Sequence, residues 1–463
     1  MSESVSGTVD SELAIDEAIG LSPDHVQAVT RAIEEEDLQQ VRVLVEPLHS
    51  ADVADLVEQL EPDERRILVE VIRGFVASEV LPHLGDALLD DVLQHLGVQD
   101  VAAAVAELDI DDAIDVMEDL GEDEQREVLS ALPAFERLQI EEGLAFPEDS
   151  AGRLMQRHFV AIPAYWTVGQ TIDYMRRTAD LPDEFYEIFV VDPSHHPMGT
   201  VPLYRAMRTN RPVLIGDIME TDPILMPVGM DQEDVAYQFQ QYDLTSAAVI
   251  DDSNRLIGVI MVDDVVDVIH EEAEEDIMRL AGVGESDIFW TVTETTKRRF
   301  LWLLVNLATA VLASVVISLF GATIEHIVAL AILMPIVASM GGNAGTQTMT
   351  VTVRALATRD LMVTNAFRVV SKELVVGLIN GVLFAALVAA IAGIWFGGMA
   401  LGGVIAVAMI VNMIIAALAG ILIPLGFSRL GIDPAIAATV FVTTVTDVVG
   451  FFAFLGLGTW LLL

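Results

Sequence analysis

The chain has 463 residues, no cysteine, and 70 acidic against 24 basic side chains, which gives a net charge of −46 at neutral pH. The lack of cysteine excludes disulfides and thiolate metal sites, and the acidity argues against nucleic acid as a partner, because nucleic acid requires basic patches. Residues 301–463 hold five acids and five bases, so the excess negative charge lies within residues 1–300. This charge favours cations as partners, although solubility or a salty cytoplasm would account for the same acidity.

The first part of the chain carries a helical repeat. Between residues 30 and 149, apolar residues recur every twelve positions: Leu48, Leu60, Ile72, Leu84, Leu96, Leu108, Leu120 and Leu132. Several are followed by a break and an acidic helix start, as in LEPDE and LGEDE, where acids favour the helix N-terminus. We expect an all-α domain over residues 1–149, built as a small superhelix of short stacked helices. An irregular helical bundle is the alternative.

Residues 150–270 change to an α/β pattern. Strands are expected at 159–162, 188–191, 247–250 and 256–261, with helices at 167–178 and 231–242. Two segments, EIFVVDPSHHPMGTVPLYRAM and SAAVIDDSNRLIGVIMVDDVV, share one order of strand, turn, strand and helix. They resemble a tandem pair of CBS repeats, which is a regulatory module.

The resemblance implies a nucleotide pattern that this chain only partly keeps. In that family a Ser or Thr, followed two or three residues later by Asp, holds a ribose. The first repeat instead has Pro202 and Arg205, and the second has Met261 before Asp264. Adenine nucleotide binding is therefore doubtful. The adjacent His195 and His196 in the first hairpin are expected to lie in a solvated turn rather than in a metal site.

The remaining chain reads as a linker followed by membrane spans. Residues 271–299 begin as a strongly acidic helix and end in a basic cluster, so we expect a linking helix there. Five apolar segments follow at 300–320, 327–353, 374–396, 401–425 and 435–463, each about the ~20 residues that a span needs. Lys and Arg occur before the first span, between the second and third, and between the fourth and fifth. The positive-inside rule then predicts a multi-pass protein of the inner or plasma membrane with its N-terminus cytoplasmic and its C-terminus outside.

Two features of the spans indicate an ion path. The last span carries a single charge, Asp447, within TTVTD, and an acid near mid-bilayer costs about 2.5–3.5 kcal/mol on insertion scales. The second span contains PIVASMGGNAGTQ, from which we expect unwound, Gly-rich backbone that turns polar groups towards a lumen. Close helix packing is the alternative role for these glycines.

The stretches PIVASMGGNAGTQTMTVTVRALATRDL and FVTTVTDVVG closely resemble the signature of MgtE-type magnesium channels. The order of parts is similar too: residues 1–149 as acidic helical domain, 150–270 as CBS pair, 271–299 as linking helix and 300–463 as pore domain. The resemblance implies a homodimer with one pore, in which the acid matching Asp447 binds hydrated Mg²⁺. Thr443, Thr444 and Thr446, with Asn343 and Gly342, could supply further oxygens to that path.

The same resemblance implies a Mg²⁺ sensor in the cytosolic half. The matching positions, called the sensor acids below, are Glu79, Asp111, Asp115, Glu233, Asp243, Asp264, Asp267, Glu272, Glu275 and Asp276. Without Mg²⁺ their carboxylates would repel one another and the cytosolic domains would separate. Bound Mg²⁺ would hold the domains together and draw the linking helix over the pore mouth.

The expected function is a Mg²⁺-selective channel that carries Mg²⁺ into the cell and is closed by cytosolic Mg²⁺. A broader transporter of Co²⁺, Ni²⁺ or Mn²⁺ is one alternative, because selectivity depends on pore radius and hydration. A membrane regulator without transport is another, but it would leave Asp447 without a role. An enzyme is not expected, since the sequence contains no HExxH, P-loop or serine–histidine arrangement.

Overall fold

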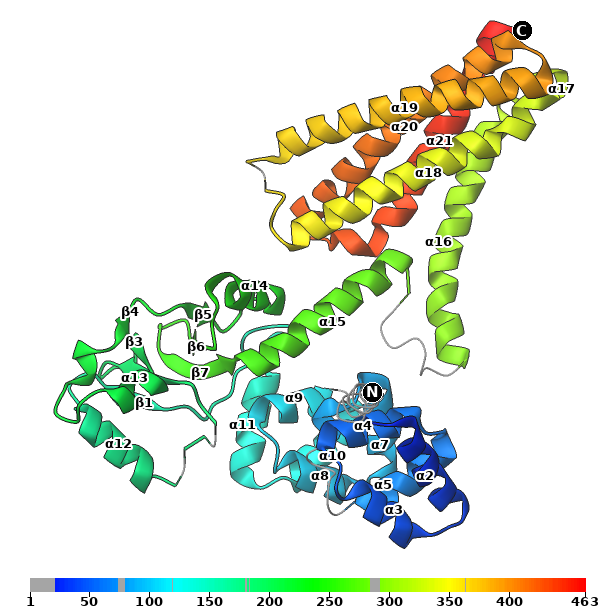
Figure 1. The fold of residues 1–463 in the computed structure, drawn as a ribbon. Helices are drawn as coiled ribbons and strands as arrows, with labels where there is room; N and C mark the ends of the chain where they lie inside the picture. The colour runs from blue at the N-terminus through cyan, green and yellow to red at the C-terminus, as the bar shows by residue number, and fades with distance from the viewer. Residues whose placement is uncertain are drawn as a thin grey trace, which may run out of the picture. The chain divides into compact units, whose positions relative to one another are not determined.

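The computed structural model describes residues 21–73, 80–118, 120–179, 181–182, 184–283, 292–362 and 364–463. The chain divides into two compact units, Met1–His270 and Glu271–Leu463 (Figure 1). The first unit contains a helical part and an α/β part, and the second contains the long apolar helices. Each unit is described by itself below.

The helical part of the first unit is a series of short helices around one apolar core. They are α2 (Pro23–Glu34), α3 (Leu38–Val45), α4 (Ser50–Gln59), α5 (Pro62–Ile72), the 3₁₀ turn η1 (Leu81–His83), α7 (Asp86–His95), α8 (Val98–Val105), α9 (Ile110–Glu118), α10 (Glu122–Ala131) and α11 (Ala134–Leu144). Helices two apart in the order pack together, as α8 does on α10 and α9 on α11. The predicted all-α fold of stacked short helices is confirmed.

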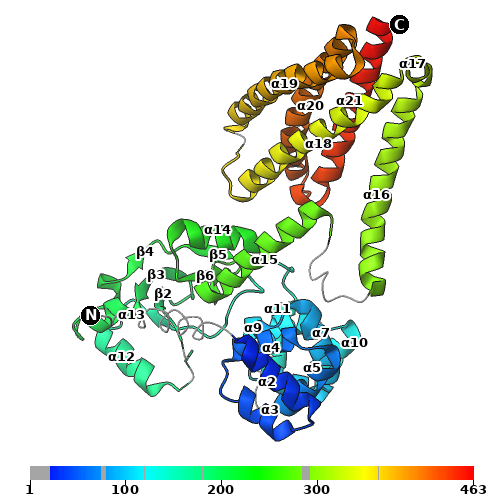
Figure 2. The same ribbon diagram turned by 45° about the vertical axis from the view of Figure 1, so that its right-hand side comes forward.

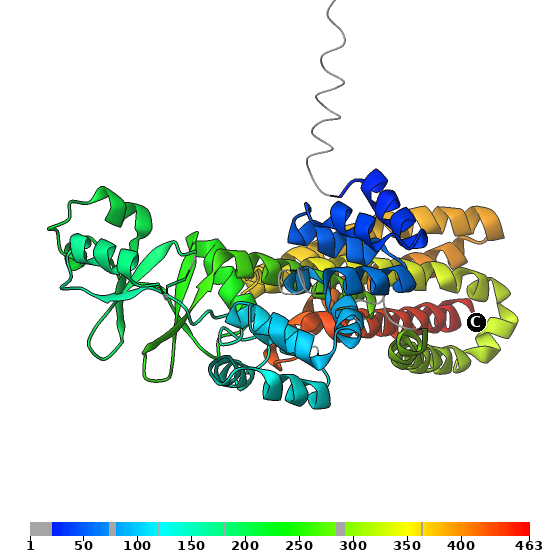
Figure 3. The ribbon, with the colours of Figure 1, turned by 90° about the horizontal axis from the view of Figure 1, so that it is seen from below.

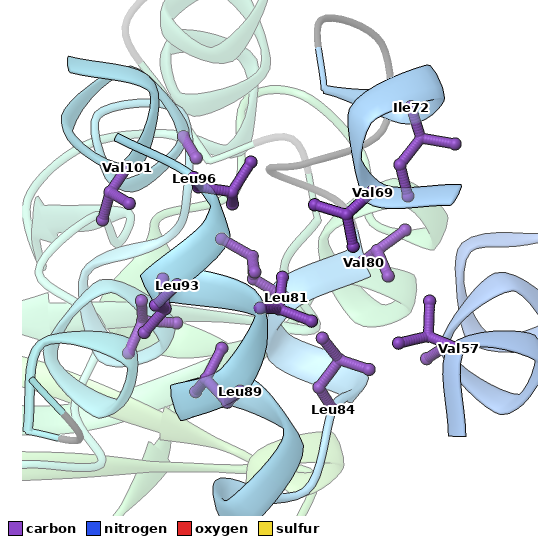
Figure 4. Close-up of a cluster of buried hydrophobic side chains, with 14 of the residues drawn as sticks. Val57, Val69, Ile72, Val80, Leu81, Leu84, Leu89, Leu93, Leu96 and Val101 are labelled. Atoms are coloured by element: carbon purple, nitrogen blue, oxygen red, sulfur yellow. The ribbon is translucent and has the colours of Figure 1, made fainter. Parts of the chain in front are cut away.

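The twelve-residue repeat has a direct structural cause. Leu60, Leu96 and Leu132 each follow the last residue of a helix, and each is at most 5% exposed. The chain turns at these leucines while their side chains fill the shared core, part of which is drawn in Figure 4. Burying each leucine stabilises the fold by about 1.5–3 kcal/mol relative to an exposed side chain. Acidic residues then begin the next helix, as the three acids in the first turn of α10 do.

The α/β part holds two sheets built to one plan. The first sheet has the order β1 (Ala161–Pro163), β2 (Glu187–Val191), β3 (Pro197–Pro202) and β4 (Glu220–Thr221), and the second has the order β5 (Leu225–Pro227), β6 (Ser246–Ile250) and β7 (Leu256–Met261). In both, a parallel strand pair is followed by an antiparallel hairpin. The helices are α12 (Val168–Arg177), α13 (Leu203–Arg208), η2 (Ile215–Asp217) and α14 (Gln232–Tyr242). This repetition confirms the predicted tandem α/β pair.

The two hairpins of this pair lie side by side (Figure 3). Phe189 and Val191 of the first sheet share a small core with Ala248, Leu256 and Val259 of the second. The backbone N–H of Leu256 also donates a hydrogen bond of 2.9 Å to the carbonyl of His195 in the other hairpin. The two repeats are therefore joined through both apolar and backbone contacts.

The second unit is a bundle of long helices, viewed from another side in Figure 2. Helix α15 (Val262–Ala281) leads into it, and the bundle holds α16 (Val292–Ser318), the short α17 (Gly321–His326), α18 (Val328–Ala357), α19 (Ala366–Phe396), α20 (Met399–Arg429) and α21 (Pro434–Leu462). Five of these are long and apolar enough to cross a membrane, which confirms the predicted number of spans. Helix α20 is the most buried of the five and contacts α18, α19 and α21.

Candidate functional site

Asp447 lies near the middle of α21 and is half-buried. In the part of the chain that the structure describes, its carboxylate has no hydrogen-bond or ion-pair partner. The neighbouring threonines do not bind it, because Thr443, Thr444 and Thr446 each donate to a carbonyl of their own helix at 2.6–2.9 Å. A carboxylate within an apolar helix that lacks an internal partner is suited to bind a cation.

The glycine-rich segment is not unwound, so that expectation is wrong. Helix α18 runs without a break from Val328 to Ala357, with Pro335 inside it. In an apolar environment a broken helix would leave N–H and C=O groups unpaired, at a cost of several kcal/mol each. The chain therefore keeps the helix and uses its glycines for close contact with neighbouring helices, which was the alternative reading of this motif.

These contacts separate two faces of α18. An added Cβ at Gly345 would lie 2.6 Å from Val442 and 3.6 Å from the Thr446 methyl group, so α21 packs closely here. Thr446 is fully buried in this contact. Gly342 faces Thr443 at a looser 4.0 Å, and Asn343 is exposed. Of the residues predicted for the ion path, Asn343 is exposed and Thr446 is buried in the helix contact. The others are partly exposed: Gly342, Thr443, Thr444 and Asp447.

The sequence analysis missed Asn412, which is fully buried in the middle of α20. Its Nδ2 donates a hydrogen bond of 2.8 Å to the carbonyl of Val337 in α18. A lone amide within the apolar run GGVIAVAMIVNMIIAALAG was a signal that could have identified it. Its position between helices, however, follows only from the packing.

The first unit brings some of the sensor acids together. Asp111, at the start of α9, is 9% exposed, and both of its carboxylate oxygens are buried without a hydrogen-bond partner among the described residues. Gln156 lies close enough to lower the pKa of Asp111, but burial and the nearby Asp109 outweigh it and raise this pKa to about 6. A buried carboxylate whose two oxygens lack hydrogen-bond partners is suited to bind a cation.

Asp264, at the start of α15, interacts electrostatically with Asp111. Burial, followed by the charges of Asp111 and Asp263, raises the pKa of Asp264 to about 9, although it accepts a 3.3 Å hydrogen bond from the Met261 N–H. Asp112 was not predicted, yet burial and then the charge of Asp111 raise its pKa to about 7. These acids form an electronegative site between the helical part and the α/β part.

Two further sensor acids lie near this site. Asp115 on α9 and Asp267 on α15 are exposed, and their charges help to raise the pKa of Asp112. Glu233 on α14 and Asp243 at its C-terminal end are exposed, and Glu79 lies outside the described residues. Within the described ranges, no three acidic or histidine side chains meet closely enough to hold a metal ion by themselves. Mg²⁺ is usually bound by one or two carboxylates and several waters, so this dispersion is compatible with Mg²⁺ as the ligand.

A second group of acids lies at the end of α15. Glu275 pairs with Arg279, and Arg279 Nη1 lies 2.6 Å from Asp433 Oδ2 at the start of α21. Burial raises the pKa of Asp276 to about 6, with further contributions from Asp433 and then Glu272. The sequence analysis included Glu272, Glu275 and Asp276 but missed their basic and acidic neighbours.

Several polar side chains near the strands and hairpins of the α/β part are engaged within the protein. Arg205 is held within its own repeat by Glu220, at 2.5 Å, and by the carbonyl of Ile218, at 3.2 Å. Glu187 accepts a hydrogen bond of 3.1 Å from Ser246, and burial raises its pKa. His196 bonds Asp192 at 3.0 Å within its hairpin.

Three family models match the chain. One described as a divalent cation transporter matches residues 334–457, one described as the MgtE intracellular N domain matches 48–149, and one described as a CBS domain matches 215–271. A solved structure titled as the cytosolic domain of the Mg²⁺ channel MgtE in complex with ATP is 27% identical, covers 52% of this chain and 99% of its own, and has a TM-score of 0.49.

Two curated relatives carry the name magnesium transporter MgtE. The protein from Thermus thermophilus is 32% identical over 441 residues, which cover 94% of this chain and 98% of that protein. The protein from Enterococcus faecalis is 34% identical over 309 residues, or 67% of this chain and 68% of that protein. The chain therefore belongs to the MgtE family of magnesium transporters.

Proposed function

We propose that this chain forms a Mg²⁺ channel that carries Mg²⁺ into the cell and is closed by Mg²⁺ on the cytosolic side. The observation that carries the proposal is Asp447, the single acid of its span, which has no partner among the described side chains. Relatives named magnesium transporters cover most of the chain and support Mg²⁺ as the transported ion. Two protomers, each presenting one Asp447, would hold a hydrated ion without removing its water shell.

The membrane potential supplies the driving force in this proposal. With the N-terminus cytoplasmic and the C-terminus outside, inward movement gains about 2.3 kcal/mol per charge at 100 mV, and Mg²⁺ carries two charges. The proposed domains are residues 1–149 and 150–270 as sensor, 271–299 as linking helix and 300–463 as pore. The sensor acids Asp111 and Asp264 support the regulatory step, because a cation between them would relieve their repulsion.

Flux into proteoliposomes tests the path. The wild type, Asp447→Asn and the exposed-acid control Glu325→Gln would be compared with a Mg²⁺ indicator inside and an inside-negative potential. We expect Asp447→Asn to lower Mg²⁺ flux at least about tenfold, which corresponds to 1.4 kcal/mol of lost ion stabilisation, and the control to behave as wild type. Equal flux through Asp447→Asn and wild type would exclude this pore.

The same vesicles distinguish the alternatives. Comparable flux of Co²⁺, Ni²⁺ or Mn²⁺ would favour the broader transporter, because these ions differ from Mg²⁺ in how readily they bind protein ligands. No flux of any divalent ion through the wild type would favour the regulator. Loss of inhibition by Mg²⁺ on the cytosolic face in Asp264→Asn would support the sensor, whereas unchanged inhibition would remove Asp264 from it.

A further inference from the structure

We propose that Asn412 is a positioning residue for the ion path, which fixes the helix that carries Asn343 against the helix that carries Asp447. The inference rests on the proposed function, because it assigns a role to a residue beside the same path. Asn412 is fully buried in α20, the helix that contacts both α18 and α21. Its amide lies at a point where all three helices meet.

The amide is enclosed by one glycine from each neighbouring helix. An added Cβ at Gly341 of α18 would overlap the Asn412 amide, and one at Gly450 of α21 would lie 2.8 Å from its Nδ2. Any larger residue at either position would displace the amide. Because both positions are glycine, the Asn412 side chain has room between the helices.

The hydrogen bond fixes the amide to one turn of α18. Asn412 Nδ2 donates to the carbonyl of Val337 at 2.8 Å, and Gly341 lies one turn further along the same helix. A carbonyl oxygen has two lone pairs, so Val337 can accept this bond in addition to its helical one. Hydrogen bonds of this kind hold membrane helices together.

The contact lies at the depth of the candidate ion-binding side chains. At 1.5 Å per residue, Gly450 is about 4.5 Å along the axis from Asp447, and Gly341 is about 3 Å from Asn343. Asn412 is itself buried, so it acts on the ion through the helices and not as a ligand. Mg²⁺ demands near-ideal octahedral geometry, so a change in the spacing of the two helices would weaken its binding.

Cross-linking tests the positioning without any need for transport. The chain has no cysteine, so Gly342→Cys with Thr443→Cys introduces one reporter pair at a contact where a Cβ lies 4.0 Å from the Thr443 methyl group. The Cβ atoms of a disulfide lie about 3.5–4.5 Å apart, so two cysteines at this contact are near enough to be tested by oxidation. We expect this pair to oxidise readily within one protomer and about tenfold more slowly once Asn412→Ala is added. The control, Asn306→Ala, removes an exposed amide from α16 and should leave the rate unchanged.

Flux measurements on variants without the cysteines give the functional readout. We expect Asn412→Ala to elute as a single species and to raise the KM for Mg²⁺ about tenfold, with a smaller change in maximal flux. If Asn412→Ala does not fold, Asn412→Asp, which keeps the size but loses the amide donor, is measured in its place with the same expected direction.

An unchanged cross-linking rate overturns the inference, because it means that Asn412 does not set the spacing of α18 and α21. This holds whether the KM for Mg²⁺ stays the same or rises. Wild-type protein that carries no Mg²⁺ overturns the proposed function, while the cross-linking result still decides whether Asn412 positions the helices.

Discussion

The charge state of three carboxylates links the sensor to pH. Asp111, Asp112 and Asp264 have pKa values raised to about 6, 7 and 9, with burial as the largest cause and the charge of a neighbouring aspartate as the next. The folded state therefore holds protons that the unfolded chain has already released at the same pH. In the proposed sensor, protons and Mg²⁺ would relieve the same repulsion and would therefore compete at this site.

The first prediction concerns stability as a function of pH in the absence of Mg²⁺. Because the folded pKa values lie above the unfolded value of 3.8, the folded state binds more protons between pH ~4 and ~9. Stability is therefore greatest at the acidic end of this window and is lost as pH rises through the folded pKa values. We expect the Tm of the first unit, measured on the full chain with a chelator, to fall between pH ~5.5 and ~8.5.

Asp264→Asn should flatten this slope, because it removes the acid with the highest pKa of the three. The exposed control Asp222→Asn should leave the slope as in the wild type. A Tm that rises with pH in the wild type would contradict the arrangement of these acids, since it would require carboxylates stabilised in their charged form.

Sequence could suggest acids for the proposed sensor but could not show which of them are buried. Asp111 and Asp112 are adjacent in a run of acids, and only packing makes the first 9% exposed. Asn412 shows the same limit, because its role depends on two glycines that lie 71 and 38 residues away in the chain, on other helices. Asp447 could be found because a charge within an apolar run is informative without any knowledge of its neighbours.

At the scale of elements, local sequence patterns predicted where the helices lie, but they did not predict that α18 runs without a break. The five spans lie within several residues of their expected positions, because about 20 apolar residues leave few alternatives. The twelve-residue spacing located the helix ends of the helical part, since the repeated apolar residues lie in its core or pack against it. The unbroken α18 was not predicted, because the low helix propensity of glycine in water does not apply where an unpaired backbone group is so costly.

The end of α15 is attached to the start of α21 through three contacts within the second unit. Arg279 pairs with Asp433 at 2.6 Å, Thr439 donates to the carbonyl of Leu280 at 3.0 Å, and Leu280 packs on a small apolar cluster that includes Val353 and Val442. Helix α15 is the helix that we propose to close the pore. These contacts would then stabilise the closed state.

The second prediction follows from the ion pair. Arg279→Gln removes a partly buried pair worth about 1 kcal/mol, so the Mg²⁺ concentration that half-inhibits flux should rise about two- to fivefold. Flux at low cytosolic Mg²⁺ should stay as in the wild type. Arg429→Gln, at the exposed end of α20, is the matched control. A half-inhibiting concentration unchanged by Arg279→Gln would mean that this contact does not favour closure.

At the scale of the whole molecule, the charge is separated along the chain. The net charge of −46 lies in residues 1–300, while residues 301–463 are neutral. Dense like charges destabilise a compact state through self-repulsion, and any salt relieves part of it by screening. If this surface senses Mg²⁺, then Mg²⁺ must stabilise it more than another salt does at the same ionic strength.

The third prediction separates these two effects at equal ionic strength. About 10 mM MgCl₂ and about 30 mM NaCl screen charges over the same distance, between about 10 and 30 Å. We expect both salts to raise the Tm of the first unit, and MgCl₂ to raise it further, because in the proposed sensor Mg²⁺ would also bind the buried oxygens of Asp111. In Asp111→Asn with Asp264→Asn, the additional effect of MgCl₂ should vanish while the effect of NaCl remains. If the two salts stabilise the wild type equally, the acidic surface serves solubility alone, and the sensor role proposed for these acids is excluded.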